Sequence, residues 1–379
     1  MSVLFEATNL GRLRLRNRFV RSATGDGLAD SKGHVTFEEI EMFRNLSHGG
    51  VGLIVTGIAY VHPSGSISDH QLSIATDDCV AGLRALVDAG HEGGAAVAVQ
   101  LFHAGREAAA HLRGRTPTAV GPSLVEGDAF FGEAHGVMEE EDFRMITRAF
   151  ARAAIRAKEA GFDAVQLHAA HGYLFSQLLS PYTNLRRDRW GGPLENRMRF
   201  HLEVYREIRA GVGDSYPILI KLGVQDGFDG GLCLEEGTYA SANLAEAGFE
   251  CIEVSQGLRG KVYEETEYRT RIRQGSGEAY FRSWARAVKE RVKVPVMIVG
   301  GLRTVEVMEE IVLQGDADLV SLARPLIREP DLVNRWRRGD RRGSACISCN
   351  KCFESLVQGT GTRCVSVAAQ REPGQGGPV

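Results

Sequence analysis

The sequence predicts an α/β protein: a (β/α)8 TIM barrel with a C-terminal cysteine-rich extension. Three observations support this fold. Short apolar runs recur along most of the chain, helical patterns lie between many of them, and a glycine stands before several runs. The runs are continuous rather than alternating, as in parallel strands that are buried on both faces. A unit of helix, glycine and buried strand that repeats about eight times describes this barrel.

The candidate strands are short apolar runs, and a Gly or Pro turn introduces most of them. They are Phe19–Ala23, Val51–Tyr60, Ala95–Phe102, Phe162–Leu167, Ile218–Leu222, Cys251–Ser255, Val294–Val299 and Leu319–Ala323. Two turns resemble each other, because Ala160-Gly-Phe-Asp163 precedes the fourth run and Ala247-Gly-Phe-Glu250 precedes the sixth. This repetition indicates one structural unit that is used many times.

Helical periodicity lies between several of these strands. In the clearest helix, apolar residues from Phe143 to Ala157 share one face at three- and four-residue spacing. Acidic residues 139–142 favour its start, where the helix dipole is positive, and Gly161 marks its end. Further helices are expected at Glu195–Ala210, Glu235–Ala247, Phe281–Arg291 and Val305–Leu313.

A doubly wound open sheet is the competing fold. It usually places a GxGxxG fingerprint after its first strand, whereas the first strand here leads into Ser22-Ala-Thr-Gly-Asp-Gly27. The barrel is therefore expected over residues 1–340 and a cysteine-rich segment over residues 341–366. The Gly- and Pro-rich residues 367–379 are expected to be a disordered tail.

Composition and charge narrow the classes of function. A net charge of -3 gives no support to nucleic-acid or membrane-surface binding. No apolar run approaches the roughly 20 residues of a membrane span, and the N-terminus has neither the basic start nor the apolar core of a signal peptide. Seven cysteines, four of them close together near the C-terminus, do not resemble a secreted disulfide framework, so a cytoplasmic location is expected. The oligomeric state, a homo-oligomer included, is left open.

Polar side chains gather at the ends of the predicted strands, where barrels of this kind carry their active sites. After the fourth strand come His168, His171 and Tyr173. Each can hydrogen-bond an oxygen, and Tyr173 can also give up a proton. A pair of buried core histidines is the plainer interpretation.

The last two strand ends predict a phosphate site. Gly300 and Gly301 leave backbone N–H groups accessible, and Arg303 and Arg324 add positive charge where barrels commonly bind phosphate. A plain tight turn at the two glycines is the alternative.

In combination, the motifs resemble those of the Old Yellow Enzyme family of FMN-dependent oxidoreductases, over roughly residues 3–340. The motifs are Gln100-Leu-Phe-His-Ala-Gly-Arg106, His168-Ala-Ala-His-Gly-Tyr173, Ser180-Pro-Tyr-Thr-Asn184, Arg187-Asp-Arg-Trp-Gly-Gly192, Glu195-Asn-Arg197, Gly300-Gly301 and Ala323-Arg324. One of them alone is a weak signal, but all of them in this order form a specific pattern.

The resemblance implies an ene-reductase in which NAD(P)H supplies electrons for reduction of the activated C=C bond of an α,β-unsaturated carbonyl compound. The implied FMN contacts are Ala23, Thr24 and Gly25 under the ring near N5, Gln100 at the pyrimidine edge, Lys221 beside N1 and O2, and Gly300, Gly301, Arg303, Ala323 and Arg324 at the phosphate. The lysine would stabilise negative charge on the reduced ring.

The same resemblance implies roles for the substrate-side residues. His168 and His171 would hold an oxygen of the substrate, which polarises the carbonyl so that its β-carbon accepts a hydride from flavin N5. Tyr173 would protonate the α-carbon. Some relatives carry Cys and Tyr where this chain has Gly25 and Gly27, and this departure leaves the substrate preference open.

The C-terminal cysteines form a second motif. Cys346, Cys349 and Cys352 make a CxxCxxC pattern, and Cys364 follows twelve positions later. Four thiolates so spaced can bind a 4Fe–4S cluster or a tetrahedral zinc, and a metal-free remnant is the third alternative. The segment resembles the cluster segments of trimethylamine dehydrogenase and bacterial 2,4-dienoyl-CoA reductase. The remaining cysteines, Cys79, Cys233 and Cys251, are expected to be ordinary buried thiols.

Two other functions stay open at this point. The first is an amine dehydrogenase, a demethylase or a dienoyl-CoA reductase-like enzyme that passes electrons through a cysteine-bound cluster. The second is a non-redox phosphate-binding barrel, such as an aldolase or isomerase. The second explains the glycines and arginines but gives Gln100 and the His/His/Tyr group no task.

Overall fold

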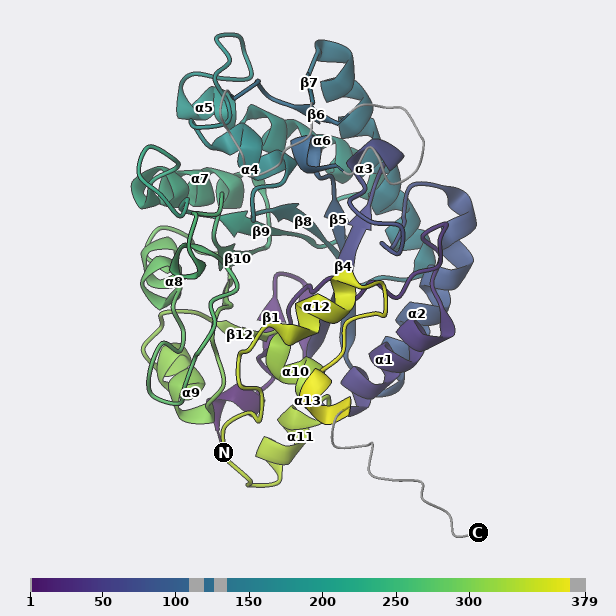
Figure 1. The fold of residues 1–379 in the computed structure, drawn as a ribbon, viewed down its shortest axis with the longest axis vertical. Helices are drawn as coiled ribbons and strands as arrows, with labels where there is room; N and C mark the ends of the chain where they lie inside the picture. Colours follow the sequence, from purple (N-terminus) through teal and green to yellow (C-terminus); the bar gives the residue numbers. More distant parts are fainter. Residues whose placement is uncertain (1, 109–118, 126–134, 369–379) are drawn as a thin grey trace.

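A computed structural model describes residues 2–108, 119–125 and 135–368, and within them eight parallel strands close into a barrel (Figure 1). The strands are β3 (Phe19–Arg21), β4 (Leu53–Tyr60), β5 (Ala96–Phe102), β8 (Ala164–Ala169), β9 (Ile218–Gly223), β10 (Cys251–Ser255), β11 (Val296–Ile298) and β12 (Leu319–Leu322). Each overlaps one predicted strand, and β12 pairs with β3 to close the ring. The predicted barrel is confirmed.

Helices surround the barrel in Figure 1. They are α1 (Phe37–His48), α2 (Val80–Glu92), α3 (Glu140–Ala160), α4 (Leu174–Leu179), α5 (Leu194–Arg197), α6 (Arg199–Val212), α7 (Leu234–Ala247), α8 (Arg282–Lys289), α9 (Val305–Leu313), α10 (Arg324–Arg328), α11 (Leu332–Arg337), α12 (Lys351–Val357) and α13 (Val365–Ala368). Short 3-10 turns are η1 (Val3–Phe5), η2 (Pro63–Gly65), η3 (Asp77–Cys79), η4 (Gly105–Glu107) and η7 (Tyr263–Glu265).

Helix α3 begins at the acidic residues and ends at the glycine that the sequence marks. The Asp142 carboxylate accepts a hydrogen bond from the backbone N–H of Glu139 at 2.8 Å, which satisfies a donor at the helix start. Gly161 ends the helix with a φ of 96°, a left-handed conformation that a glycine adopts at no steric cost. The single helix expected at Glu195–Ala210 is divided into α5 and α6.

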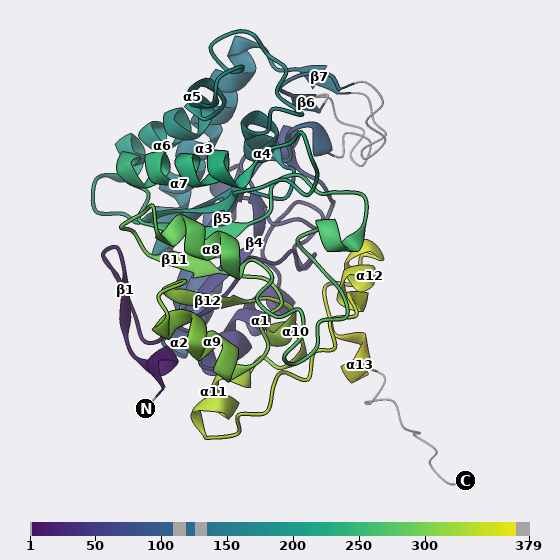
Figure 2. The same ribbon diagram turned by 90° about the vertical axis from the view of Figure 1, so that its left-hand side faces the viewer.

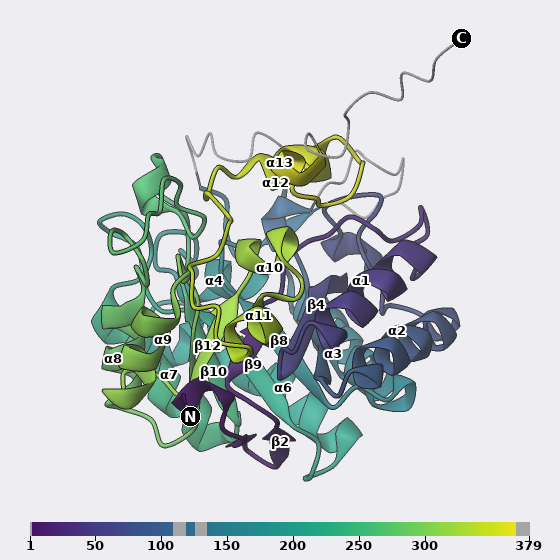
Figure 3. The same cartoon turned by 90° about the horizontal axis from the view of Figure 1, so that it is seen from below.

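Apolar side chains close one end of the barrel. The hairpin of β1 (Thr8–Leu10) and β2 (Leu13–Leu15) contributes Leu10 and Leu15 to a buried cluster with Val20, Leu53 and other inward-facing strand residues. A larger buried cluster fills the space between strands and helices. The hairpin lies at one end of the barrel and the cysteine-rich segment at the other (Figures 2 and 3), so only the second end is available for a site.

The segment after α11 runs back across the barrel mouth, where it forms α12 and α13 (Figure 3). Helix α13 includes Val367 and Ala368, and the rest of the expected tail lies outside the described residues. The short strands β6 (Val120–Gly121) and β7 (Gly136–Val137) pair beside the barrel. Within the described ranges, no helix is long and apolar enough to cross a membrane.

The isolated cysteines differ in burial. Cys79 and Cys251 are buried, as expected. The expectation for Cys233 is wrong, because this residue is exposed at the start of α7, where its sulfur has no core to enter.

Candidate active site at the barrel mouth

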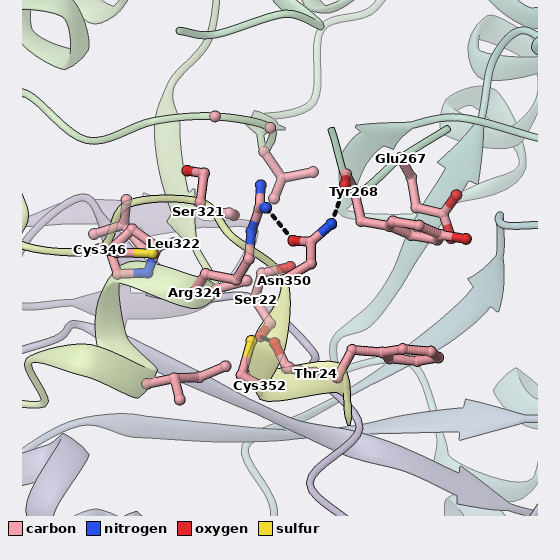
Figure 4. Close-up of a pocket in the computed structure, with 18 of the residues that line it drawn as sticks. Ser22, Thr24, Glu267, Tyr268, Ser321, Leu322, Arg324, Cys346, Asn350 and Cys352 are labelled. Atoms are coloured by element: carbon pink, nitrogen blue, oxygen red, sulfur yellow. Dashed lines mark hydrogen bonds between the residues drawn. The ribbon is translucent and has the colours of Figure 1, made fainter. Parts of the chain in front are cut away.

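A cavity of about 380 Å³ lies at the carboxyl ends of the strands, within the range of roughly 300–1,000 Å³ for small-molecule sites (Figure 4). Predicted residues that line it are Ala23, Thr24, Gly25, His171, Lys221, Gly300, Gly301, Arg303, Ala323, Arg324, Cys346, Cys349 and Cys352. Gln100, His168 and Tyr173 lie outside this lining. The structure thus brings most of the predicted flavin contacts to one place.

The loop after β8 positions the two histidines. His171 has a φ of 61°, an uncommon conformation for a residue with a side chain, and Gly172 continues the turn with a φ of 80°. The backbone N–H of His171 donates to the carbonyl of Gln256, and its Nε2 lies 2.8 Å from Ser255 Oγ. The ring of His168 lies 4.9 Å from that of His171, centroid to centroid. The predicted pair is therefore assembled from one short stretch of chain.

Both imidazoles are held neutral. Burial lowers the pKa of His168 and of His171 well below the usual value, and the positive charges of Lys221 and Arg259 lower both further. A neutral imidazole carries one N–H donor. The Ala170 N–H donates to His168 Nδ1 at 3.3 Å, and this bond assigns the His168 proton to Nε2, from which it can be donated.

Tyr173 completes the group. Its ring centroid lies 5.2 Å from that of His168 and 4.6 Å from that of Phe102. Burial raises the pKa of Tyr173, and Arg259 opposes the shift. The guanidinium of Arg259 lies 5.8 Å from the Tyr173 ring centroid and is held by the Glu267 carboxylate at 2.7 and 3.0 Å. The phenol of Tyr173 is therefore neutral at physiological pH and has a cation beside it.

Arg259 and Glu267 were missed by the sequence analysis. The available signal was a charged residue only four positions beyond the end of the sixth strand. Nothing in the sequence says that this arginine turns toward Tyr173 and not toward solvent.

A buried polar network crosses the barrel interior beneath the cavity. Lys221 Nζ donates to Ser22 Oγ at 2.9 Å and lies 3.4 Å from Glu253 Oε1. Ser22 Oγ donates to Glu253 Oε1 at 2.6 Å, and Gln166 Nε2 donates to Glu253 Oε2 at 3.0 Å. Gln100 Nε2 in turn donates to Gln166 Oε1 at 2.7 Å. These hydrogen bonds fix the side chains of Lys221 and Gln100 on the barrel side of the cavity. Glu253, which accepts three of them, was not predicted from the sequence.

The loop after β11 has two glycines with left-handed φ angles, 112° at Gly300 and 74° at Gly301. A Cβ at Gly300 would stand 2.7 Å from Tyr280 Cε2, so a side chain is excluded by contact as well as by conformation. This part of the wall requires glycine, which both the predicted phosphate site and the alternative of a plain tight turn would explain.

Two arginines bring positive charge to the same end of the cavity. Arg303 donates to the carbonyls of Ile272 (2.5 Å) and Ser344 (2.9 Å), and Arg324 donates to the carbonyl of Arg269 (2.8 Å). Among the described residues, neither arginine has a carboxylate partner, so both charges remain available to an anion. The buried Arg303 Nε also has no hydrogen-bond partner there, which fits a phosphate.

The cysteine-rich segment covers the loop after β3. Leu356 of α12 reaches the first-strand glycines: a Cβ at Gly27 would stand 2.5 Å from Leu356 Cδ1, and one at Gly25 would stand 3.7 Å from Leu356 Cδ2. Thr362 Oγ1 donates to the Gly25 carbonyl at 2.8 Å, and its N–H donates to the Asp26 carbonyl at 2.6 Å. Leu356 thus fills the space left by the missing side chain at Gly27.

The four C-terminal cysteines line a second, smaller cavity of about 120 Å³ that shares Arg324 with the first. They are Cys346, Cys349, Cys352 and Cys364. Burial raises the pKa of Cys346 and of Cys352, and Arg324 opposes both shifts. Arg328 Nη1 lies 3.7 Å from Cys364 Sγ. The thiols are free, and Arg324 and Arg328 place positive charge close to them.

Other residues of the sequence motifs stabilise a loop outside the cavity. Asn184 Nδ2 donates to the carbonyls of Leu178 and Trp190, and Arg197 Nε donates to the carbonyl of Gly192. These residues hold the loop between α4 and α5 in shape and do not line the cavity.

The comparison with known families agrees with this site. The family described as NADH:flavin oxidoreductase / NADH oxidase matches residues 3–342. The chain belongs to this family. The resemblance to Old Yellow Enzyme is thereby confirmed, and the non-redox alternative is removed. FMN and a nicotinamide are the cofactors that the family supports.

Several characterised proteins are similar to the chain. An NADH oxidase of Thermoanaerobacter brockii is 36% identical over 376 residues, 97% of this chain and 56% of that protein. A 2-naphthoyl-CoA reductase structure aligns with a TM-score of 0.89 and 28% identity, covering 96% of this chain and 56% of the other. An old yellow enzyme homologue from Zymomonas mobilis shares the fold, with a TM-score of 0.75, 23% identity and coverage of 91% and 95%. The chain spans about half the length of the first two.

Proposed function

We propose that the chain binds FMN and uses NAD(P)H to reduce an activated carbon–carbon double bond, as an ene-reductase does. The observation that supports this most is the group of His168, His171 and Tyr173, which combines two neutral imidazoles with a neutral phenol beside the cavity. One similar structure is a reductase of 2-naphthoyl-CoA, a carbonyl compound conjugated to carbon–carbon double bonds.

The substrate-side residues act on the carbonyl and on the α-carbon. His168 Nε2 and a nitrogen of His171 donate hydrogen bonds to the carbonyl oxygen and stabilise the negative charge that develops there. Tyr173 gives its proton to the α-carbon and regains one from solvent, and Arg259 stabilises the phenolate in between. NAD(P)H and one proton are consumed for each double bond reduced.

The cationic and hydrogen-bond-donating groups around the cavity suit FMN. When bound, FMN supplies the hydride chemistry between NAD(P)H and the substrate. Lys221 brings positive charge from β9 to balance the anionic reduced ring, and Thr24 and Gly25 supply a wall. Arg303, Arg324, Gly300 and Ala323 would hold the phosphate, because both arginines have charge that no described carboxylate neutralises.

We also propose that Cys346, Cys349, Cys352 and Cys364 hold an iron–sulfur cluster. The four cysteines line one cavity of about 120 Å³, and their CxxCxxC spacing with a fourth cysteine supplies the four thiolates that an iron–sulfur cluster needs. A cluster there would pass electrons to or from the flavin. Iron, sulfide and zinc analysis of anaerobically purified protein tests this assignment.

The main test separates the two half-reactions. The FMN-loaded protein should be bleached by NADH or NADPH under anaerobic conditions, and cyclohexenone should restore the flavin absorbance while cyclohexanone forms. A protein that binds no FMN would contradict the proposal. So would a reduced flavin that dioxygen reoxidises and cyclohexenone does not.

The amine dehydrogenase alternative predicts a different result in the same assay. A small methylated amine would bleach the flavin without NAD(P)H. The two neutral imidazoles disfavour this reaction, because N–H donors suit a carbonyl oxygen better than a cation.

A further inference from the structure

Asn350 links the cysteine-rich segment to the flavin cavity. It stands between Cys349 and Cys352, immediately before α12, and its φ of 60° is left-handed. Asn is one of the few residues that adopt this conformation readily. The backbone turn aims the side-chain amide at the cavity, which Asn350 lines together with Arg324 and Tyr268.

Both the oxygen and the nitrogen of this amide form hydrogen bonds. Asn350 Oδ1 accepts a hydrogen bond from Arg324 Nη1, and Asn350 Nδ2 donates to the Tyr268 carbonyl at 2.6 Å (Figure 4). Arg324 Nη1 also donates to the Arg269 carbonyl at 2.8 Å. The guanidinium is therefore fixed from two directions, by the loop after β10 and by the segment that carries the cysteines.

The chemistry of the amide suits an anion site. An amide oxygen orients a guanidinium without cancelling its charge, whereas a carboxylate would form an ion pair with it. An arginine has five N–H donors, so Arg324 keeps others for a phosphate. The donor half of the amide fixes the orientation, because an oxygen in place of Nδ2 would face the Tyr268 carbonyl oxygen.

We propose that Asn350 is a positioning residue that sets Arg324 for the phosphate of the flavin nucleotide. The cysteine-rich segment thereby takes part in cofactor binding, in addition to any metal that it holds. This inference rests on the proposed binding of FMN, and it adds a residue to that site.

The test compares FMN with riboflavin, which has the same ring and no phosphate. In Asn350→Asp, a substitution of equal size, we expect the affinity for FMN to fall about tenfold or more, because a charged acceptor competes with the phosphate for Arg324. Riboflavin affinity should stay within about twofold. Dissociation constants come from flavin fluorescence quenching, on preparations of equal metal content.

A second variant at Asn350 and a control variant elsewhere test whether the amide itself is responsible. Asn350→Gly suits the left-handed backbone and removes only the amide, so FMN should again weaken more than riboflavin. Asn243→Asp is the matched control, because Asn243 Nδ2 also donates to a carbonyl, that of Tyr239 at 2.9 Å, on the exposed surface of α7. It should bind both flavins like the wild type.

The outcomes separate this inference from the function on which it rests. Equal FMN affinity in wild type and both Asn350 variants would overturn the role of Asn350 alone. An equal loss of FMN and riboflavin would overturn it too, because the phosphate would then not be the group affected. A wild-type protein that binds neither flavin would contradict the proposed function and this inference together.

Discussion

The two ends of the cavity are built in different ways. At the end of β8, a single stretch of chain supplies His168, His171 and Tyr173, and burial keeps all three neutral. At the ends of β11 and β12, Arg303 and Arg324 carry full charges and are held by backbone carbonyls and an amide from distant segments. Neutral donors suit a carbonyl oxygen, and uncompensated cations suit a phosphate.

Because the two ends are built differently, mutations should affect them separately. Changes at the β8 end should alter the handling of the substrate and leave cofactor affinity intact. Changes at the β11–β12 end should alter cofactor affinity through the phosphate. The first two predictions below test that division.

The largest effect is expected at Tyr173. Tyr173→Phe removes the proton donor and keeps the ring, so reoxidation of reduced flavin by cyclohexenone should slow by about 100-fold or more. Reduction by NAD(P)H should change little, because it needs no proton from this group. Stopped-flow absorbance measures both phases. An unchanged reoxidation rate would assign the proton to another donor.

The histidine pair should come next. His168→Ala combined with His171→Ala removes two hydrogen bonds to a substrate oxygen, and a phenol ligand should bind about 30-fold more weakly. FMN should remain bound, whereas Arg324→Ala should weaken FMN binding and, at saturating FMN, leave the phenol affinity unchanged. Titration of the flavin spectrum measures both. Loss of FMN from the double histidine variant would mean that the pair has been misplaced.

A third buried imidazole provides a control outside the site. His201 on α6 is fully buried against Phe175, neither ring nitrogen has a hydrogen-bond partner among the described residues, and burial lowers its pKa to about 3. The unfolded chain takes up a proton at His201 below a pH of about 6.5, while the folded chain does not. Stability contributed by this group is therefore complete above pH 6.5 and is lost as the pH falls below it.

His201→Leu should remove that dependence. Between pH 7.5 and pH 5, the free energy of unfolding of the wild type should fall by about 2 kcal/mol more than that of the variant. Urea unfolding at the two pH values measures the difference. Identical losses in the two proteins would show that His201 is protonated in the folded state.

The smallest effect is expected at the wall over Gly27. Leu356→Ala opens the space that the leucine side chain fills, so the ratio of kcat/KM for a ring-substituted enone to that for cyclohexenone should rise, by at most about tenfold. The matched control is Leu313→Ala, an exposed leucine at the end of α9. An unchanged ratio would place Leu356 outside the substrate path.

Local patterns in the sequence predicted the barrel and the β8 end. All eight strands were found because each is a short buried run, and burial on both faces leaves a continuous apolar signature. His168, His171 and Tyr173 were found because six consecutive residues carry them. The turn at Gly300 and Gly301 was also predicted, because paired glycines mark a turn, and both residues have left-handed φ angles.

Contacts between distant segments could not be predicted in the same way. Leu356 meets Gly27 across more than three hundred residues, and Asn350 meets Arg324 through a turn that no periodicity marks. Arg259 follows β10 by a few positions, and its direction depends on Glu267, which lies in the same irregular loop. A sequence shows that such polar residues exist, but their partners depend on the folded chain.

The position of deuterium in the reduced enone distinguishes hydride transfer to the β-carbon from protonation of the α-carbon. For turnover of cyclohexenone in D2O with unlabelled NAD(P)H, we expect deuterium at the α-carbon, delivered through Tyr173, and hydrogen at the β-carbon, delivered from the nicotinamide by way of the flavin. The product is analysed by NMR immediately, before the ketone exchanges its α-hydrogens, with unlabelled cyclohexanone incubated in parallel. Deuterium at the β-carbon, or none at the α-carbon, would rule out this route for the hydride and the proton.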